Sequence, residues 1–260
     1  MGRKIIDRTG EENVNNFGSK MIIVGYRNAH DIDIYFTEYN WTAKNTRYDY
    51  FRNGNISCPY ERSVYAVGYL GEGEYKCKEN GRITRVYTTW HSMLNRCYDD
   101  KFYKRRPTYK DCRVSEKFLN FQNFGMWDEE NYYKIEGERI ALDKDILYKH
   151  NKIYSPETCI YVPERINTLF TKSDNYRGDS VIGTHCLKNG KYQVHCCLLN
   201  PKTGKSKNKY LGIYDTQQKA FEIYKYYKEK NIKEVADYYK DKIPQKLYNA
   251  MYGYEVEIDD

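Results

Sequence analysis

The stretch from residue 142 to residue 170 constrains the fold more than any other part of the sequence. Its first piece, residues 142–147, places apolar residues on both sides of acidic ones, and β-forming residues fill residues 159–162 after a polar turn. Pro163 suits the first turn of a helix, whose apolar side would be formed by Ile166, Leu169 and Phe170. We therefore expect a strand, a loop, a second strand and a helix.

This order of elements resembles the HNH nuclease motif, especially that of phage HNH and HNH-like homing endonucleases. In that family two strands and one helix cradle a single divalent metal ion. The resemblance matches Asp143 to the acidic position that ends the first strand, and Asn167 to the metal ligand on the helix. It implies a metal site with Asp145 as a third oxygen ligand, and hard oxygen donors of this kind suit Mg²⁺ or Mn²⁺.

Two positions depart from the family pattern. Lys144 stands where the family has its general-base histidine, and Thr158 falls near the asparagine that orients this histidine. A neutral imidazole accepts a proton near pH 7, whereas a lysine does so only if its surroundings lower its pKa by several units. The candidate catalytic residues are therefore Lys144, His150 and Thr158, with a metal-bound water as another base. A structural cradle without catalysis is the alternative.

Helical patterns precede this unit. Apolar residues from Trp90 to Cys97 recur at helical spacing, with Thr88 or Thr89 as the expected cap, and an aromatic stripe over residues 118–127 indicates a second helix. The ordered set Tyr-x-x-Trp-x-x-Met-x-x-Arg-Cys-Tyr, Phe-x-x-Phe-x-x-Phe, Leu-Asp and Tyr-Ser-Pro-Glu-x-Cys is similar to one phage HNH-like group. These helices would supply a core to a motif that is too small to fold alone.

A basic run lies between the two predicted helices. It contains Lys104, Arg105 and Arg106, with tyrosines on either side. Such a run is either a solvated loop or a segment that lies along a phosphate backbone. We keep both interpretations and include these three residues among the candidate DNA-binding residues.

The last third of the chain indicates three strands followed by a helix. The pattern Leu-Gly-x-Tyr-Asp-Thr and then Ala-Phe-x-x-Tyr is similar to the Apetala-type DNA-binding domain, whose sheet enters the major groove. We expect this helix to break at Lys230-Asn231 and a short helix to follow. The cations of this region predict a positive sheet face that favours backbone affinity over base reading; they are Lys188, Lys191, Lys202, Lys205, Lys207 and Lys209.

Composition limits the class of protein. The 260 residues include 43 Lys+Arg against 36 Asp+Glu, for a net charge of +7, and this balance favours a polyanionic partner. Thirty tyrosines make the chain too aromatic for a disordered protein. No apolar run reaches the ~18 residues of a membrane span, and no signal-peptide core opens the sequence. We expect a cytoplasmic protein, and the phage resemblance places it in an infected bacterial host.

Together these patterns predict an α+β protein with three parts. Residues 1–73 form a small β-rich domain, residues 74–176 an HNH-like domain, and residues 177–260 an Apetala-like domain with a helical tail. The resemblance implies a protein that binds double-stranded DNA and nicks or cuts it with one metal ion. Two alternatives stay open: a catalytically inactive DNA-binding regulator, and a phage protein whose tyrosine-rich surface binds and inhibits a host protein.

Overall fold

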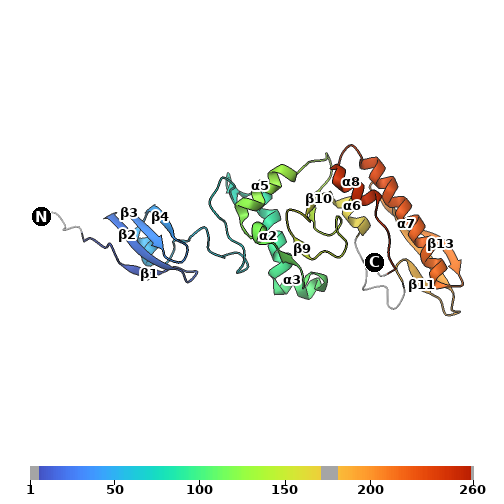
Figure 1. Ribbon diagram of the computed structural model, residues 1–260, viewed down its shortest axis with the longest axis horizontal. Coiled ribbons are helices and arrows are strands. Elements are labelled where there is room, and N and C mark those ends of the chain that lie inside the picture. Colours follow the sequence, from blue (N-terminus) through green and yellow to red (C-terminus); the bar gives the residue numbers. More distant parts are fainter. Residues whose placement is uncertain (1–5, 171–180, 259–260) are drawn as a thin grey trace. The chain divides into compact units, whose positions relative to one another are not determined.

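The computed structural model describes residues 6–170 and 181–258 and shows a mixed α+β protein (Figure 1). The chain divides into two compact units, Met1–Glu130 and Asn131–Asp260. The finer division into residues 1–73, 74–176 and 177–260 stays a prediction, and its second boundary lies outside the described residues.

The first unit begins with a four-stranded antiparallel sheet whose strands follow chain order. Its strands are β1 (Glu12–Val14), β2 (Lys20–Asn28), β3 (Asp31–Phe36) and β4 (Trp41–Thr46), followed by helix α1 (Tyr48–Arg52). Ile32, Ile34 and Phe36 alternate along β3 with Asp33 and Tyr35, and all three are fully buried and pack with Phe51 of α1. One face of this sheet therefore forms a small core of its own.

The rest of the first unit is mainly helical. A hairpin turns at Asn80 and Gly81, both at positive φ as the Asn-Gly signal requires. The elements are β5 (Lys78–Glu79), β6 (Arg82–Ile83), α2 (Arg85–Tyr98), α3 (Asp100–Arg105), the 3₁₀ turn η1 (Pro107–Tyr109), β7 (Arg113–Val114), α4 (Glu116–Leu119) and α5 (Phe121–Asn131).

Both predicted helices of this region exist, with two corrections. Thr84, and not Thr88 or Thr89, caps α2 by accepting a hydrogen bond from the Tyr87 N–H. The aromatic helix is interrupted at Asn120, because the Leu119 carbonyl and the Phe121 N–H both bond to the backbone of Tyr69. The local spacing of apolar residues could not predict these two hydrogen bonds, since Tyr69 is distant in sequence.

The second unit contains the predicted strand-loop-strand-helix order. Strand β8 ends at Asp143 and pairs antiparallel with β10, and α6 follows directly. The elements are β8 (Ile140–Asp143), β9 (Ile153–Tyr154), β10 (Ile160–Pro163), α6 (Glu164–Asn167), the 3₁₀ turn η2 (Thr168–Phe170), β11 (Thr184–Cys186), β12 (Tyr192–Leu199), β13 (Ser206–Tyr214), α7 (Gln217–Tyr239) and α8 (Gln245–Tyr252).

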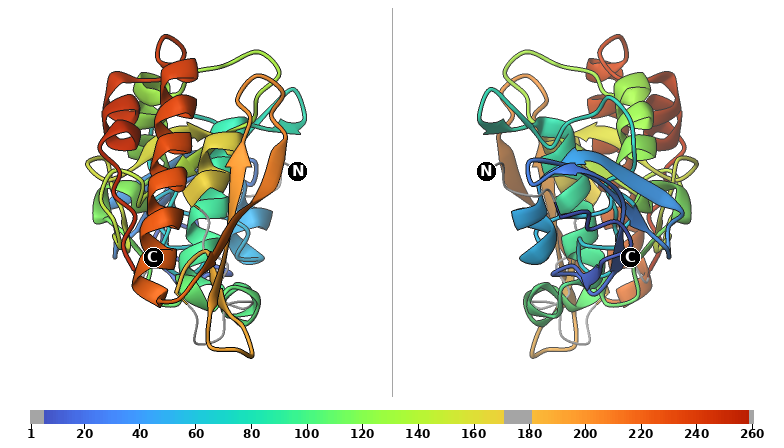
Figure 2. Two further views of the ribbon diagram at one scale, coloured as in Figure 1. Left: turned by 90° about the vertical axis from the view of Figure 1, so that its right-hand side faces the viewer. Right: turned by 90° about the vertical axis from the view of Figure 1, so that its left-hand side faces the viewer.

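The β8–β10–α6 unit, hereafter the ββα unit, shares its core with the C-terminal helices. Buried side chains of β10 and α6 pack in one cluster with Leu199 of β12 and with apolar residues of α7 and α8. Helix α7 also covers one face of the antiparallel sheet β11–β12–β13 (Figure 2). The residues of the predicted HNH-like and Apetala-like domains that the structure describes therefore share one apolar core.

Helix α7 is continuous where the sequence indicated a break. Asn231 is buried in the middle of the helix, and its amide accepts a hydrogen bond from the Leu199 N–H and donates one to the Leu199 carbonyl, both at 2.9 Å. These two bonds satisfy a polar residue that would be unfavourable inside an apolar helix face. One helix of about 35 Å therefore replaces the two that were expected.

Within residues 6–170 and 181–258, no helix combines the length and the apolar content that crossing a membrane requires.

We expect Asn231→Ala to destabilise the second unit by about 2–3 kcal/mol, because it leaves both Leu199 backbone groups buried without partners. Urea unfolding followed by circular dichroism measures this change. The matched control is Lys230→Ala, which alters the adjacent exposed position of the same helix. Equal stability of the two variants would contradict the bridging role of Asn231.

Candidate functional site

The register of the two-stranded ribbon sets the geometry of the ββα unit. Asp143 at the end of β8 lies opposite Ile160 at the start of β10, whereas Ile140 lies opposite Pro163, after which α6 begins. The ribbon therefore has Asp143 at one end and the start of α6 at the other. Asn167 is the last residue of this four-residue helix and is half-buried.

The Asp143 carboxylate is held by the loop that follows it. Its Oδ1 accepts hydrogen bonds from the backbone N–H groups of Asp145 at 2.9 Å and Ile146 at 2.8 Å. Loss of solvent around the carboxyl, together with the nearby charge of Asp145, raises the pKa of Asp143 to about 6 despite these two bonds. The neighbouring Cys159 thiol is also enclosed, and burial raises its pKa to about 12.

Lys144 is buried, with a relative exposure of 6%. Its Nζ donates to Asp145 Oδ2 at 2.9 Å and to the Asn151 carbonyl at 3.0 Å, and it lies 5.8 Å from the centre of the Tyr154 ring. Asn151 returns the contact, since its Nδ2 donates to the Lys144 carbonyl at 2.7 Å. Sequence reasoning missed Asn151, although the preference of asparagine for turns pointed to the polar run that contains it.

The other two catalytic candidates face different partners. His150 has a positive φ of 61°, and its Nε2 lies 3.8 Å from the Glu257 carboxylate in the C-terminal segment. Thr158 closes a turn, because its Oγ1 donates to the Ile153 carbonyl at 2.7 Å and accepts from the Ser155 N–H at 3.2 Å. His150 and Thr158 therefore share none of the partners described for Lys144.

The predicted metal ligands make a poor site for a divalent ion. One oxygen of Asp143 already accepts two backbone N–H groups, and the Lys144 ammonium binds the Asp145 carboxylate. A second cation beside this ammonium would meet like-charge repulsion. Among the described residues, no three His, Cys, Asp or Glu side chains are grouped so as to hold a metal ion. The pairing of Asp143 with Asn167 around Mg²⁺ or Mn²⁺ stays a prediction.

The predicted basic residues lie at several places. Lys104 and Arg105 end helix α3 of the first unit, with Arg106 next to them, and all three are exposed. In the second unit, Lys188 and Lys191 lie at the β11–β12 turn, where Lys191 pairs with Asp215 at 2.8 Å.

The three-stranded sheet has two chemically different faces. Val194 and Cys196 of β12 are buried against α7, and Lys209 is the register partner of Cys196. Lys209 Nζ accordingly lies 4.8 Å from the ring of Tyr227 on α7. Lys207, the partner of Leu198, shares this face. The expectation of one positive sheet face is thus corrected: these two lysines lie on the helix side.

The opposite face, hereafter the outer face, is polar and neutral. It carries the residues that alternate with Val194 and Cys196, together with their partners on β13. The His195 and Tyr210 rings lie 5.4 Å apart, and the Tyr210 side chain is half exposed. The face is formed by Gln193, His195, Cys197, Asn208, Tyr210 and Ile213. Strand alternation was the sequence signal that could have identified it.

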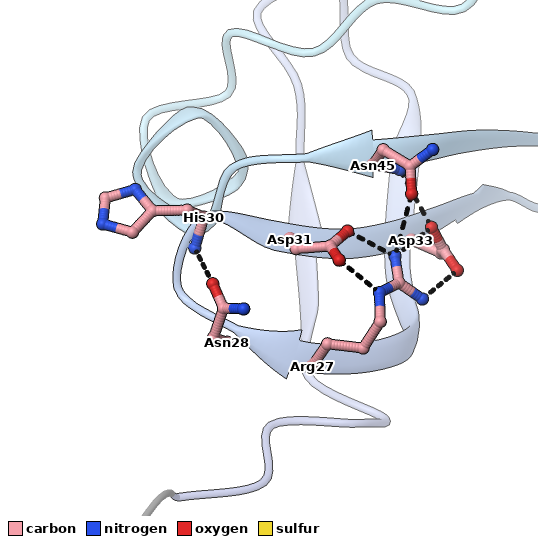
Figure 3. Close-up of polar contacts among 6 residues, drawn as sticks. All are labelled: Arg27, Asn28, His30, Asp31, Asp33 and Asn45. Carbon is pink, nitrogen blue, oxygen red and sulfur yellow. Dashed lines mark hydrogen bonds and ion pairs between the residues drawn. The ribbon is translucent and has the colours of Figure 1, made fainter.

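A further polar cluster lies on the N-terminal sheet (Figure 3). The Arg27 guanidinium on β2 binds the carboxylates of Asp31 and Asp33 on β3, with four N–O distances between 2.6 and 2.8 Å. Asn45 on β4 donates its backbone N–H to Asp33 at 3.0 Å. The hydrogen bonds from Arg27, which have the largest effect, and from the Asn45 N–H lower the pKa of Asp33 to about 2. The bonds of this cluster join β2, β3 and β4. Because its two carboxylates outnumber its one arginine, the cluster does not attract phosphate.

Comparison of the chain with protein-family models, with curated proteins and with solved structures gave no match.

We expect Asp143→Asn to remove a pH dependence of stability. A raised carboxyl pKa contributes stability that is present below pH 3.8 and is lost as the pH rises through about 6. Asparagine keeps an acceptor for the two N–H groups without the buried charge, so the variant should gain about 1–3 kcal/mol at pH 8 relative to wild type. Urea unfolding at pH 5 and pH 8 tests this, with the exposed Asp241→Asn as control. A wild-type pH dependence in Asp143→Asn would refute it.

We expect Arg27→Gln to raise the pKa of Asp33 from about 2 toward its ordinary value of 3.8. The stability that this carboxylate contributes is present above pH 3.8 and is lost as the pH falls toward 2, and the variant should lack most of this loss. Carbon-13 NMR titration of the carboxyl groups measures the shift. Arg47→Gln, which removes a similar contact to Asp49, should leave Asp33 unchanged. An unaltered Asp33 titration in Arg27→Gln would show that Arg27 is not the cause.

Proposed function

We propose that this protein binds double-stranded DNA through the outer face and the turns of the β11–β12–β13 sheet. The observation that carries the proposal is the strand register, which separates the cations of this region from a neutral face of hydrogen-bonding side chains. A protein that reads DNA needs both components, since cations bind phosphates and neutral donors and acceptors recognise base edges.

The turn lysines are suited to phosphate contacts. Lys188 and Lys191 precede β12, whereas Lys202 and Lys205 follow it, so the two pairs lie at opposite ends of an eight-residue strand. Such a strand is about 26 Å long. This spacing exceeds the ~12 Å width of a major groove, so lysines at both ends can reach phosphates while the strand between them lies in the groove.

The outer face carries side chains that can form hydrogen bonds with base edges in the major groove. Amide side chains such as Gln193 and Asn208 can pair with the N6 and N7 edge of adenine, and the His195 ring can donate to or accept from a base. Tyr210 and Ile213 add exposed apolar surface beside them. The lysines therefore provide affinity and the amides provide selectivity, in addition to the backbone affinity that was expected to outweigh base reading.

The ββα unit supports kinship with the HNH homing endonucleases of phages, because it has their order of elements. Its polar groups, however, favour the non-catalytic alternative. Lys144 is engaged by Asp145 and Asn151, and His150 faces Glu257. We therefore propose that the unit is a scaffold for the DNA-binding sheet, joined to it by the core around α7.

The test is the salt dependence of binding to duplex DNA, measured by fluorescence anisotropy. We expect log Kd to rise linearly with log salt, and Lys202→Gln combined with Lys205→Gln to reduce the slope by about 2, because each phosphate contact contributes ~0.9. Gln193→Ala combined with Asn208→Ala should lower affinity for a selected sequence with little change in slope.

The matched control is Lys134→Gln combined with Lys230→Gln, which removes the same charge from exposed positions outside the sheet strands and their turns. An equal reduction of the salt slope in the two double lysine variants would show a general effect of charge and would reject this surface as the DNA-binding site. Absent or salt-independent binding would instead support the host-protein alternative. Nicking of the same duplex with Mg²⁺ or Mn²⁺, lost in Asp143→Ala, would reject the scaffold assignment.

A further inference from the structure

We propose that the Lys144 ammonium takes the place of a divalent metal ion in the ββα unit, as a cation covalently attached to the chain. This inference goes beyond DNA binding, since it concerns what holds the loop between β8 and β9. It predicts that the unit folds without a bound metal ion.

The oxygen atoms that accept hydrogen bonds from Lys144 Nζ are of the kinds that bind hard metal cations. One is a carboxylate oxygen, Asp145 Oδ2 at 2.9 Å, and another is a backbone carbonyl oxygen, that of Asn151 at 3.0 Å. Carboxylate and carbonyl oxygens are also the common ligands of Mg²⁺ and Ca²⁺ in proteins. The Tyr154 ring, 5.8 Å away, adds its electron-rich face on a third side.

The ammonium also performs the structural work of a metal ion, because it closes a loop. Its bond to the Asn151 carbonyl and the return bond from Asn151 Nδ2 to the Lys144 carbonyl join the two ends of residues 144–151. Asn151 Nδ2 further donates to the Ile153 carbonyl at the start of β9. The loop is thereby fixed between strands without an external ligand.

Charge balance gives the third argument. Asp143 and Asp145 place two carboxyl groups two residues apart, on either side of Lys144, so that their negative charges repel each other. A cation between or beside such groups relieves this repulsion. Lys144 has a side-chain exposure of 8%, so its charge acts on Asp145 with less solvent screening than that of a surface lysine.

The experiment uses the full chain without DNA, so its outcome is separate from that of the DNA-binding test. Wild type should show no bound Mn²⁺ by electron paramagnetic resonance, and neither EDTA nor millimolar Mn²⁺ should change its Tm. Lys144→Met keeps the length and apolar stem of the side chain and removes the cation. Its Tm should fall by about 4 °C or more in EDTA.

If the ammonium stands in for a metal ion, the oxygens released by Lys144→Met should accept one. Millimolar Mn²⁺ should then restore about 2–4 °C of the lost Tm, since a ligand that binds only the native state stabilises it. Lys134→Met, an exposed substitution in the same unit, should show neither the loss nor the recovery.

Two results would overturn the inference. The first is Mn²⁺ bound to wild type and lost in Asp145→Asn, a measurement that does not depend on how Lys144→Met folds. The second is a Lys144→Met variant that keeps the wild-type Tm or that Mn²⁺ does not stabilise, which would reduce Lys144 to an ordinary ion pair.

Discussion

The apolar core that the ββα unit shares with helices α7 and α8 is the interaction on which the second unit depends. Two four-residue strands and a four-residue helix cannot bury enough surface to be stable alone. Val162 and Ile166 are completely buried because Val235, Leu247 and other apolar residues of α7 and α8 complete the cluster around them. The position of the Asp143 loop therefore depends on residues that lie far later in the chain.

Helix α7 has a second role because it packs on two different partners. Ala220, Phe221 and Tyr224 near its start cover the three-stranded sheet, while Ile232 and Val235 contact the ββα core. Asn231 lies between these two regions and binds both backbone groups of Leu199. The three-stranded sheet and the ββα unit are consequently both packed against one helix.

Much of the local structure could be predicted from the sequence because each pattern has a physical period. The alternation of Ile32, Ile34 and Phe36 with Asp33 and Tyr35 is typical of a strand with one buried face, and Asn80-Gly81 is typical of a tight hairpin turn. The break at Asn120 and the continuity of α7 through Asn231 could not be predicted in this way. Both depend on hydrogen bonds with residues distant in sequence, Tyr69 and Leu199.

The sequence by itself determined the alternation of buried residues in β3, the acidic residues at the end of β8 and the excess of lysine. Only the tertiary structure decided what these charges face. Register turned Lys209 toward Tyr227 and left His195 and Tyr210 on the other side of the sheet. Loop closure brought Lys144 to Asn151. The reason is that local spacing fixes which element forms, whereas the partner of a charged group depends on how separate elements pack.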